Sequence, residues 1–121
     1  MSVNDQRTPA AEVDFAVLEG EDEFAATIVF GNEDHTLGNA LRHCLMQLKE
    51  TEFCGYSVPH PYEPKMNVRI QTKGEPALDV LRKGLGNLSE VANIVDEHFL
   101  NALVAFENDQ DKAASKKKSK R

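Results

Sequence analysis

The sequence predicts a small domain that mixes strands and helices, and three patterns predict it. In two runs, 24–30 and 66–72, apolar residues alternate with polar ones, as in strands that have one buried face. Residues 37–48 place apolar side chains three and four positions apart, which is the spacing of an amphipathic helix. After Pro76 a similar spacing continues as far as Phe106.

The first strand leads into the first helix through a short polar turn. Gly31 and Asn32 have the side chains that tight turns favour. Asp34 or Thr36 then offers an oxygen atom to the unpaired amide groups at the start of a helix. We therefore expect the chain to change from strand to helix between residues 31 and 36.

The middle of the chain predicts two further strands around a stiff loop. Residues 53–58 form a short strand-like run. Pro59, Pro61 and Pro64 interrupt any strand ladder after it, because proline has no amide hydrogen to donate. Residues 59–65 are therefore predicted to be a surface loop before the strand at 66–72.

The last element is predicted as one long helix or two joined helices. Pro76 suits a first turn, whereas Gly84 and Gly86 each cost about 1 kcal/mol relative to alanine in a helix. The apolar residues follow alternating spacings of three and four, which is typical of a seam against another helix: Leu78, Leu81, Leu85, Leu88, Ala92, Val95, Phe99, Ala102 and Phe106.

A continuous helix from 76 to 106 would be about 46 Å long, and a compact chain of this size has a diameter of about 35 Å. One small sheet cannot cover such a helix. We therefore expect a partner surface to cover part of the seam. The alternative is that the whole seam packs on the sheet and first helix of the same chain.

Charge divides the chain into an acidic body and a basic end. Residues 107–121 hold six Lys or Arg against three acids, which leaves eight basic and seventeen acidic groups in residues 1–106. An acidic body does not favour sequence-specific nucleic-acid binding, which depends on neutralising phosphates. We predict a disordered acidic leader over 1–22, a domain over 23–106 and a disordered basic tail over 107–121.

The tail ends in a run that is a candidate nuclear import signal. A phosphate-seeking arm and a solubilising end are alternative interpretations of this run. Its basic residues are Lys116, Lys117, Lys118, Lys120 and Arg121.

The reactive side chains favour no catalytic interpretation. The four histidines are scattered, the two cysteines lack the spacing of a zinc site, and no glycine-rich phosphate loop is present. A thiol enzyme using Cys44 and His35 is an alternative, although Cys44 falls among core-facing leucines. No run approaches the ~20 apolar residues of a membrane span. We expect no cofactor, no metal, no small-molecule substrate and no membrane.

The motif HTLGNALR at 35–42 resembles the first-helix motif of the alpha-like assembly subunits of cellular RNA polymerases. The resemblance continues through FCGY at 53–56, PHP at 59–61, EPK at 63–65 and RIQT at 69–72. It covers roughly residues 22–106. The order of motifs is most similar to the small members shared by RNA polymerases I and III, with the RNA polymerase II counterpart as the near alternative.

The resemblance implies an α+β fold, with a small antiparallel sheet and two main helices on one face. It also implies a non-catalytic subunit that heterodimerises with a larger alpha-like subunit, as a platform for the large catalytic subunits. Such a protein would work in the nucleus, including the nucleolus, in the transcription of ribosomal RNA, 5S RNA and tRNA. A homodimeric interaction module is the alternative outside this function.

Carried onto this sequence, the resemblance predicts a partner interface on both helices. In these subunits the polar face at the motif's arginine, here Arg42, turns toward a large catalytic subunit. The predicted interface residues are Leu37, Asn39, Leu41, Arg42, Leu45, Leu81, Leu85, Leu88, Val95 and Phe99. Of these, Leu37, Leu41 and Leu45 are candidates either for the core or for the seam against the partner.

Overall fold

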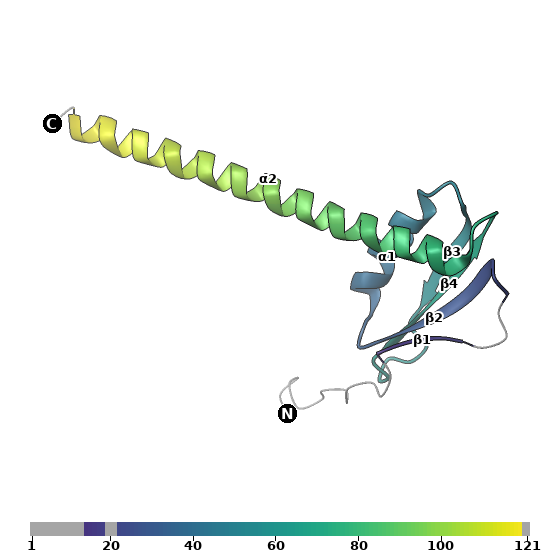
Figure 1. Ribbon diagram of the computed structural model, residues 1–121. Coiled ribbons are helices and arrows are strands. Elements are labelled where there is room, and N and C mark those ends of the chain that lie inside the picture. The colour runs from purple at the N-terminus through teal and green to yellow at the C-terminus, as the bar shows by residue number, and fades with distance from the viewer. Residues whose placement is uncertain (1–13, 19–21, 120–121) are drawn as a thin grey trace, which may run out of the picture. The chain divides into compact units, whose positions relative to one another are not determined.

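The computed structural model describes residues 14–18 and 22–119 (Figure 1). In these ranges it contains four strands and two helices. Their order is β1 (Phe15–Val17), β2 (Ala25–Gly31), α1 (His35–Met46), β3 (Thr51–Ser57), β4 (Lys65–Thr72) and α2 (Ala77–Ser119). The chain divides into two units after Leu88. We therefore describe the domain that ends at Leu88 and the helical segment that starts at Ser89 separately.

The strands form one antiparallel sheet in the order β1-β2-β4-β3. Ile28 of β2 lies opposite Val68 of β4, which in turn lies opposite Tyr56 of β3. Because side chains alternate along each strand, this register collects the apolar residues on one face. The buried side chains of this face are Ala26, Ile28, Phe30, Cys54, Met66, Val68 and Ile70.

Helix α1 begins where the turn chemistry predicts. Asn32 has a φ of 59°, a left-handed conformation that asparagine tolerates better than most residues. The Asp34 carboxylate accepts a hydrogen bond from the Thr36 amide at 3.0 Å, so Asp34 is the cap. The helix contributes Leu41 and Leu45, both fully buried, to the core.

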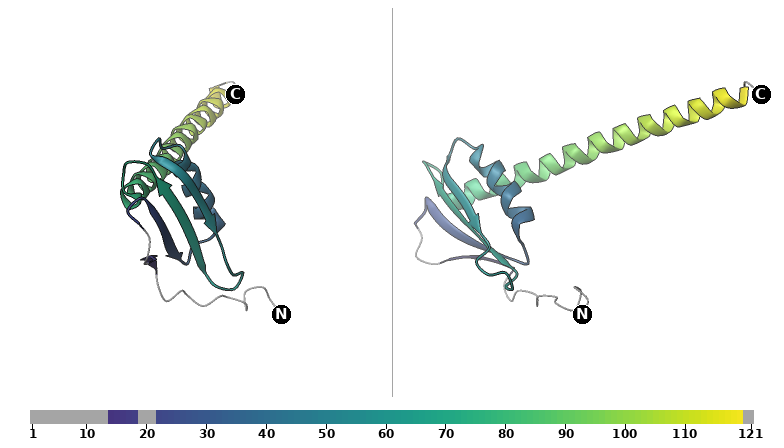
Figure 2. Two further views of the ribbon diagram at one scale, coloured as in Figure 1. Left: turned by 90° about the vertical axis from the view of Figure 1, so that its right-hand side faces the viewer. Right: turned by 180° about the vertical axis from the view of Figure 1, so that it is seen from behind.

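The first turns of α2 join α1 in covering the sheet. Thr72, at the end of β4, donates a hydrogen bond from its hydroxyl to the Glu75 carbonyl at 2.5 Å, just before the helix starts. Ala77, Val80 and Leu81 are then buried in the same core cluster as the α1 leucines. Helix α1 and the part of α2 that ends at Leu88 lie on the same side of the sheet (Figure 2). The predicted α+β fold, an antiparallel sheet with two main helices on one face, is confirmed.

Helix α2 runs from Ala77 to Ser119 without interruption. Of the two predicted possibilities, one long helix or two joined helices, the structure shows one helix that continues through Gly84 and Gly86. Its described part also passes beyond Phe106, the end of the predicted domain. Residues 107–119 are helical and exposed, whereas the sequence predicts a disordered tail there. Alanine and lysine are strong helix formers, and no Gly or Pro interrupts the run.

The predicted leader also differs from the structure in one segment. Phe15–Val17 forms β1, and the Phe15 ring meets the Phe30 ring edge to face with centroids 5.4 Å apart. Three residues are too few to show a periodic pattern in the sequence. The pairing with β2 stabilises this strand instead. The rest of the predicted leader, apart from 14, 18 and 22, lies outside the described residues. Among those that the structure does describe, no helix has the length and apolarity to cross a membrane.

Candidate partner interface

The predicted interface residues fall into three groups by burial. Leu41 and Leu45 are fully buried, and Leu81 is 3% exposed. These three side chains pack in the core of their own domain, so they offer no surface to another chain in this structure. A spacing of three and four residues marks an apolar helix face, and the face of a core helix and that of an interface helix look the same in sequence.

A second group lies at the margin of the core or on the polar side of α1. Leu37, Leu85 and Leu88 are half-buried and pack against the core cluster from outside. Asn39 and Arg42 are exposed on α1. These five residues are therefore accessible in part or in full, as an interface requires.

The third group lies in the helical segment after Leu88. Val95 and Phe99 are 63% and 64% exposed. Full burial of one such side chain contributes about 1.5 to 3 kcal/mol, so a surface of this kind favours a partner. The large apolar residues exposed here are Val91, Ile94, Val95, Phe99, Leu100, Leu103, Val104 and Phe106.

The HTLGNALR motif has a visible structural role. A side chain at Gly38 would overlap the Tyr56 ring and the Met66 sulfur, with its Cβ 2.5 Å from Tyr56 Cδ2. Gly38 therefore lets α1 approach β3 and β4 closely. Tyr56 also holds the first residue of the motif, because its hydroxyl lies 3.1 Å from His35 Nδ1.

The reactive groups do not converge. Cys44 and Cys54 are free thiols that are buried at 7% and 3% exposure. Burial raises the pKa of the Cys54 thiol to about 11, against the opposing charge of Arg42. Within the described residues, the His35 ring shares a hydrogen bond with the Tyr56 hydroxyl and not with a thiol. In the described ranges, no three His, Cys, Asp or Glu side chains are grouped as a metal site would need.

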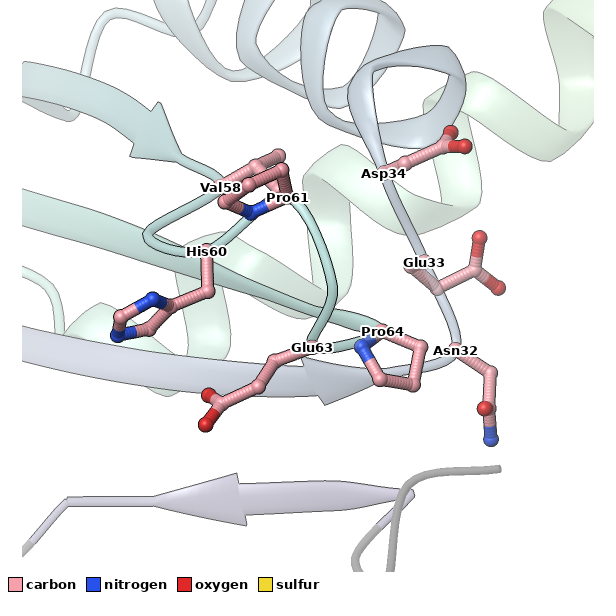
Figure 3. A pocket seen from close by; sticks show the side chains of 8 residues that line it. All are labelled: Asn32, Glu33, Asp34, Val58, His60, Pro61, Glu63 and Pro64. Carbon is pink, nitrogen blue, oxygen red and sulfur yellow. The ribbon is translucent and has the colours of Figure 1, made fainter. Parts of the chain in front are cut away.

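A shallow hollow of about 340 Å³ lies between the β2–α1 turn and the proline-rich loop before β4. The carboxylates of Glu33 and Asp34 point to one side of it, and the side chains of His60 and Glu63 point to the other (Figure 3). Asp34 is also engaged as the α1 cap. This divergence gives no common point at which a ligand would be held.

The basic run ends α2. Lys116, Lys117 and Lys118 are exposed in the last helical turn. Lys120 and Arg121, which complete the predicted import run, lie outside the described residues.

Comparisons with known proteins agree with this arrangement. Residues 25–98 match the RNA polymerase Rpb3/Rpb11 dimerisation domain. A zebrafish (Danio rerio) protein, DNA-directed RNA polymerases I and III subunit RPAC2, is 46% identical over 94 residues, covering 77% of this chain and 84% of that protein.

Two yeast proteins with the same name are similar over a shorter stretch. The Schizosaccharomyces pombe protein is 52% identical over 80 residues, covering 65% of this chain and 64% of that protein. The Saccharomyces cerevisiae protein is 50% identical over 80 residues, and the match covers 65% of this chain and 56% of that protein. The chain thus spans less than two thirds of the length of each yeast relative.

The fold matches that of a solved archaeal protein, DNA-directed RNA polymerase subunit L from Thermoplasma acidophilum. The TM-score is 0.69 over 82% of this chain and 97% of that chain, at 19% identity. This likeness concerns the fold alone, whereas the family match and the zebrafish relative rest on sequence. The resemblance predicted from the motifs is confirmed, and the chain belongs to the RNA polymerase Rpb3/Rpb11 dimerisation domain family.

Proposed function

We propose that this chain is the small alpha-like subunit of RNA polymerases I and III and forms a heterodimer with the larger alpha-like subunit. The observation that carries the proposal is the exposed apolar face of α2 beyond Leu88, where the described residues leave more than half of Val95 and of Phe99 exposed. The family, named for dimerisation, supports a protein partner as the missing cover.

The choice of polymerase rests on the relatives. The zebrafish and yeast proteins are named as subunits of RNA polymerases I and III, which favours this pair over the RNA polymerase II alternative. A homodimer is less favoured, because residues 1–106 carry an excess of nine acidic groups that would repel a second copy. Relatives from nuclear polymerases support a nuclear location, and we extend this proposal to the nucleolus.

Within the polymerase the heterodimer serves as a platform for the large catalytic subunits. The chain supplies no active site and no cofactor, and it supports the synthesis of ribosomal RNA, 5S RNA and tRNA. Arg42, exposed on the polar side of α1, is the residue we assign to docking of a large subunit. The basic run that starts at Lys116 is the assigned nuclear import signal.

The test is the solution mass of this chain co-expressed with the larger alpha-like subunit, measured by light scattering after size exclusion. The parent chain is expected to form a one-to-one complex. Phe99→Glu places a charge on the apolar face and is expected to weaken the complex by roughly tenfold or more. Asn108→Glu, an exposed change of similar size on the same helix, is the matched control.

Two outcomes would contradict the proposal. A parent chain that stays a monomer or homodimer in the presence of the larger subunit would remove the heterodimer. Equal affinities for Phe99→Glu and Asn108→Glu would remove the α2 face as its interface.

A further inference from the structure

A serine lies inside the basic run at 116–121, which we call the import run. Ser119 has three lysines directly before it and a Lys-Arg pair directly after it in the sequence. Its side chain is exposed, as are those of Lys116, Lys117 and Lys118. No carboxylate of residues 14–18 and 22–119 pairs with these three lysines. The sequence therefore places five positive charges within three positions of an exposed hydroxyl group.

The surroundings of Ser119 along α2 are polar. The large apolar residues of the helix end at Phe106, thirteen positions earlier. Residues 107–119 contain no large apolar residue, and all of them are exposed. At 1.5 Å per residue, Ser119 lies about 20 Å along the helix from Phe106. A partner that covers the apolar face of α2 therefore leaves this hydroxyl open to an enzyme.

The Ser119 side chain also contributes to the end of the helix. Its hydroxyl donates a hydrogen bond to the Lys116 carbonyl at 3.0 Å. Carbonyls in the last turn of a helix have no amide partner within the helix, so this hydroxyl supplies one. Helix ends open at little cost in free energy. A kinase that binds its substrate as an extended segment therefore needs to open only this last turn to reach Ser119.

Ser115 is the other serine near the run, and it is the less suitable acceptor. It also is exposed, but it lies one turn earlier in α2. An extended segment centred on Ser115 requires a second helical turn to open. A single lysine, Lys112, lies within the three positions before Ser115, whereas all three positions before Ser119 are lysine.

We propose that Ser119 is a phosphorylation site for a serine kinase that selects basic sequences, with ATP as the phosphoryl donor. The Ser119 hydroxyl oxygen attacks the γ-phosphorus of ATP and forms a new O–P bond. The bond from the γ-phosphorus to the bridging oxygen breaks, ADP leaves with the electron pair, and the hydroxyl proton passes to a base of the kinase. Carboxylates of such a kinase bind the flanking lysines, so charge complementarity selects both the enzyme and the serine.

Phosphorylation of Ser119 weakens the import run in two ways. This consequence rests on the proposed function, because it takes the run as the nuclear import signal. The phosphate adds a charge of about −1.5 to −2, against the five positive charges of the run. The ester oxygen also has no proton to donate to the Lys116 carbonyl, and negative charge is unfavourable at the C-terminal end of a helix. The phosphorylated chain is therefore imported less than the unmodified chain.

The first experiment phosphorylates the purified chain, co-expressed with the larger alpha-like subunit, using the catalytic domain of protein kinase C and radiolabelled ATP. Label in this chain is measured after gel electrophoresis. Ser119→Ala is expected to lower the initial rate of labelling by about tenfold. Ser89→Ala is the matched control, because Ser89 is exposed on the same helix but has no basic residue within three positions. Equal rates for these two variants, or loss of the label in Ser115→Ala instead, overturn the assignment of Ser119.

The second experiment measures the ratio of nuclear to cytoplasmic fluorescence of the tagged full chain in cells. Ser119→Asp is expected to lower this ratio at least about twofold, because it places negative charge inside the import run. Asn108→Asp adds the same charge at an exposed position of α2 outside the run, and it should leave the ratio unchanged. Ser119→Ala loses the hydrogen bond without adding charge, and it should not lower the ratio.

The failures of the two proposals are distinguishable. Equal ratios for Ser119→Asp and Asn108→Asp overturn the effect of the phosphate, whereas the import signal stands if Lys116→Ala/Lys117→Ala/Lys118→Ala still lowers the ratio. If the triple lysine variant leaves the ratio unchanged, the proposed import signal fails and the effect of the phosphate on import fails with it. The labelling experiment decides independently whether Ser119 accepts phosphate.

Discussion

Gly84 of α2 lies directly against Leu45 of α1. A Cβ atom at position 84 would overlap the end of the Leu45 side chain, and it would lie 3.8 Å from Leu41 Cδ1. Glycine at this position costs helix propensity but allows the two helices to meet over the sheet. The same contact explains why this glycine does not break the helix, because it is fixed by packing rather than by a turn.

Gly84→Ala is expected to destabilise the domain. Alanine gains about 1 kcal/mol of helix propensity, but the new methyl group overpacks the α1–α2 contact at a cost of typically 1 to 3 kcal/mol. We expect a net loss of up to about 2 kcal/mol. Urea denaturation followed by circular dichroism measures the free energy of unfolding.

Gly86→Ala is the matched control. Apart from its chain neighbours and the backbone of its own helix, no described residue has an atom within 4 Å of a Cβ placed there, and Gly86 is exposed. The substitution should therefore stabilise the chain by up to about 1 kcal/mol through helix propensity alone. Equal changes in the free energy of unfolding for the two variants would show that the contact with Leu45 does not restrict position 84.

The sequence predicts most of the fold because the relevant signals are local. The alternation at 24–30 and 66–72 identifies two central strands, and Asp34 is one of the two caps that the residue types allow. Strand β1 is missed because three residues contain too little periodicity, and a partner strand supplies its stability. The helix beyond Phe106 is missed because it has no apolar pattern and depends on propensity alone.

The candidate interface is less predictable, for a physical reason. Leu81 and Val95 occupy the same heptad seam, two heptads apart, yet one is in the core and the other is 63% exposed. Hydrophobic periodicity records that a helix face is buried and does not record which chain buries it. Leu41 and Leu45 are buried because the sheet reaches under them, whereas the exposed residues of α2 lie beyond the domain core. How far the sheet and α1 extend is a tertiary property, so the sequence pattern does not show it.

The buried Cys54 thiol makes stability depend on pH in the alkaline range. Its pKa rises from 9.0 to about 11 because burial disfavours the thiolate. A raised pKa means that the folded state holds its proton where the unfolded state has lost it. The protonated Cys54 thiol therefore contributes about 2 to 3 kcal/mol to the free energy of unfolding. This contribution is complete below about pH 8.5 and disappears as the pH rises to 11.

The measurement is the free energy of unfolding at pH 8.5 and pH 10.5, at constant ionic strength, for the parent chain and for Cys54→Ala. The variant loses some stability at both pH values because of the cavity it leaves. Its decrease between the two values should be smaller than that of the parent, since other titrating groups are common to both. Identical decreases would exclude Cys54 as the source.

The basic run at the end of α2 should control nuclear import. Removing three positive charges there is expected to lower the ratio of nuclear to cytoplasmic fluorescence of the tagged chain at least about twofold, because import receptors bind clustered Lys and Arg. The control removes three charges elsewhere, at exposed positions. The test variant is Lys116→Ala/Lys117→Ala/Lys118→Ala, and the control variant is Lys49→Ala/Lys73→Ala/Lys112→Ala. The same ratio in both would assign the run no role in import.

Arg42→Glu is expected to separate heterodimer formation from docking of the large subunits. Arg42 is exposed on the polar side of α1, away from the buried Leu41 and Leu45, so the domain and its heterodimer should form normally. Reversing the charge at a docking contact places like charges together and should weaken that contact by roughly tenfold or more.

The measurement is the ratio of the large subunits to the larger alpha-like subunit, determined by mass spectrometry after purification through a tag on this chain. Arg82→Glu, an exposed reversal on α2, is the control and should leave this ratio unchanged. A normal ratio with Arg42→Glu would remove Arg42 from the docking surface, and loss of the heterodimer would place it on the dimer interface instead.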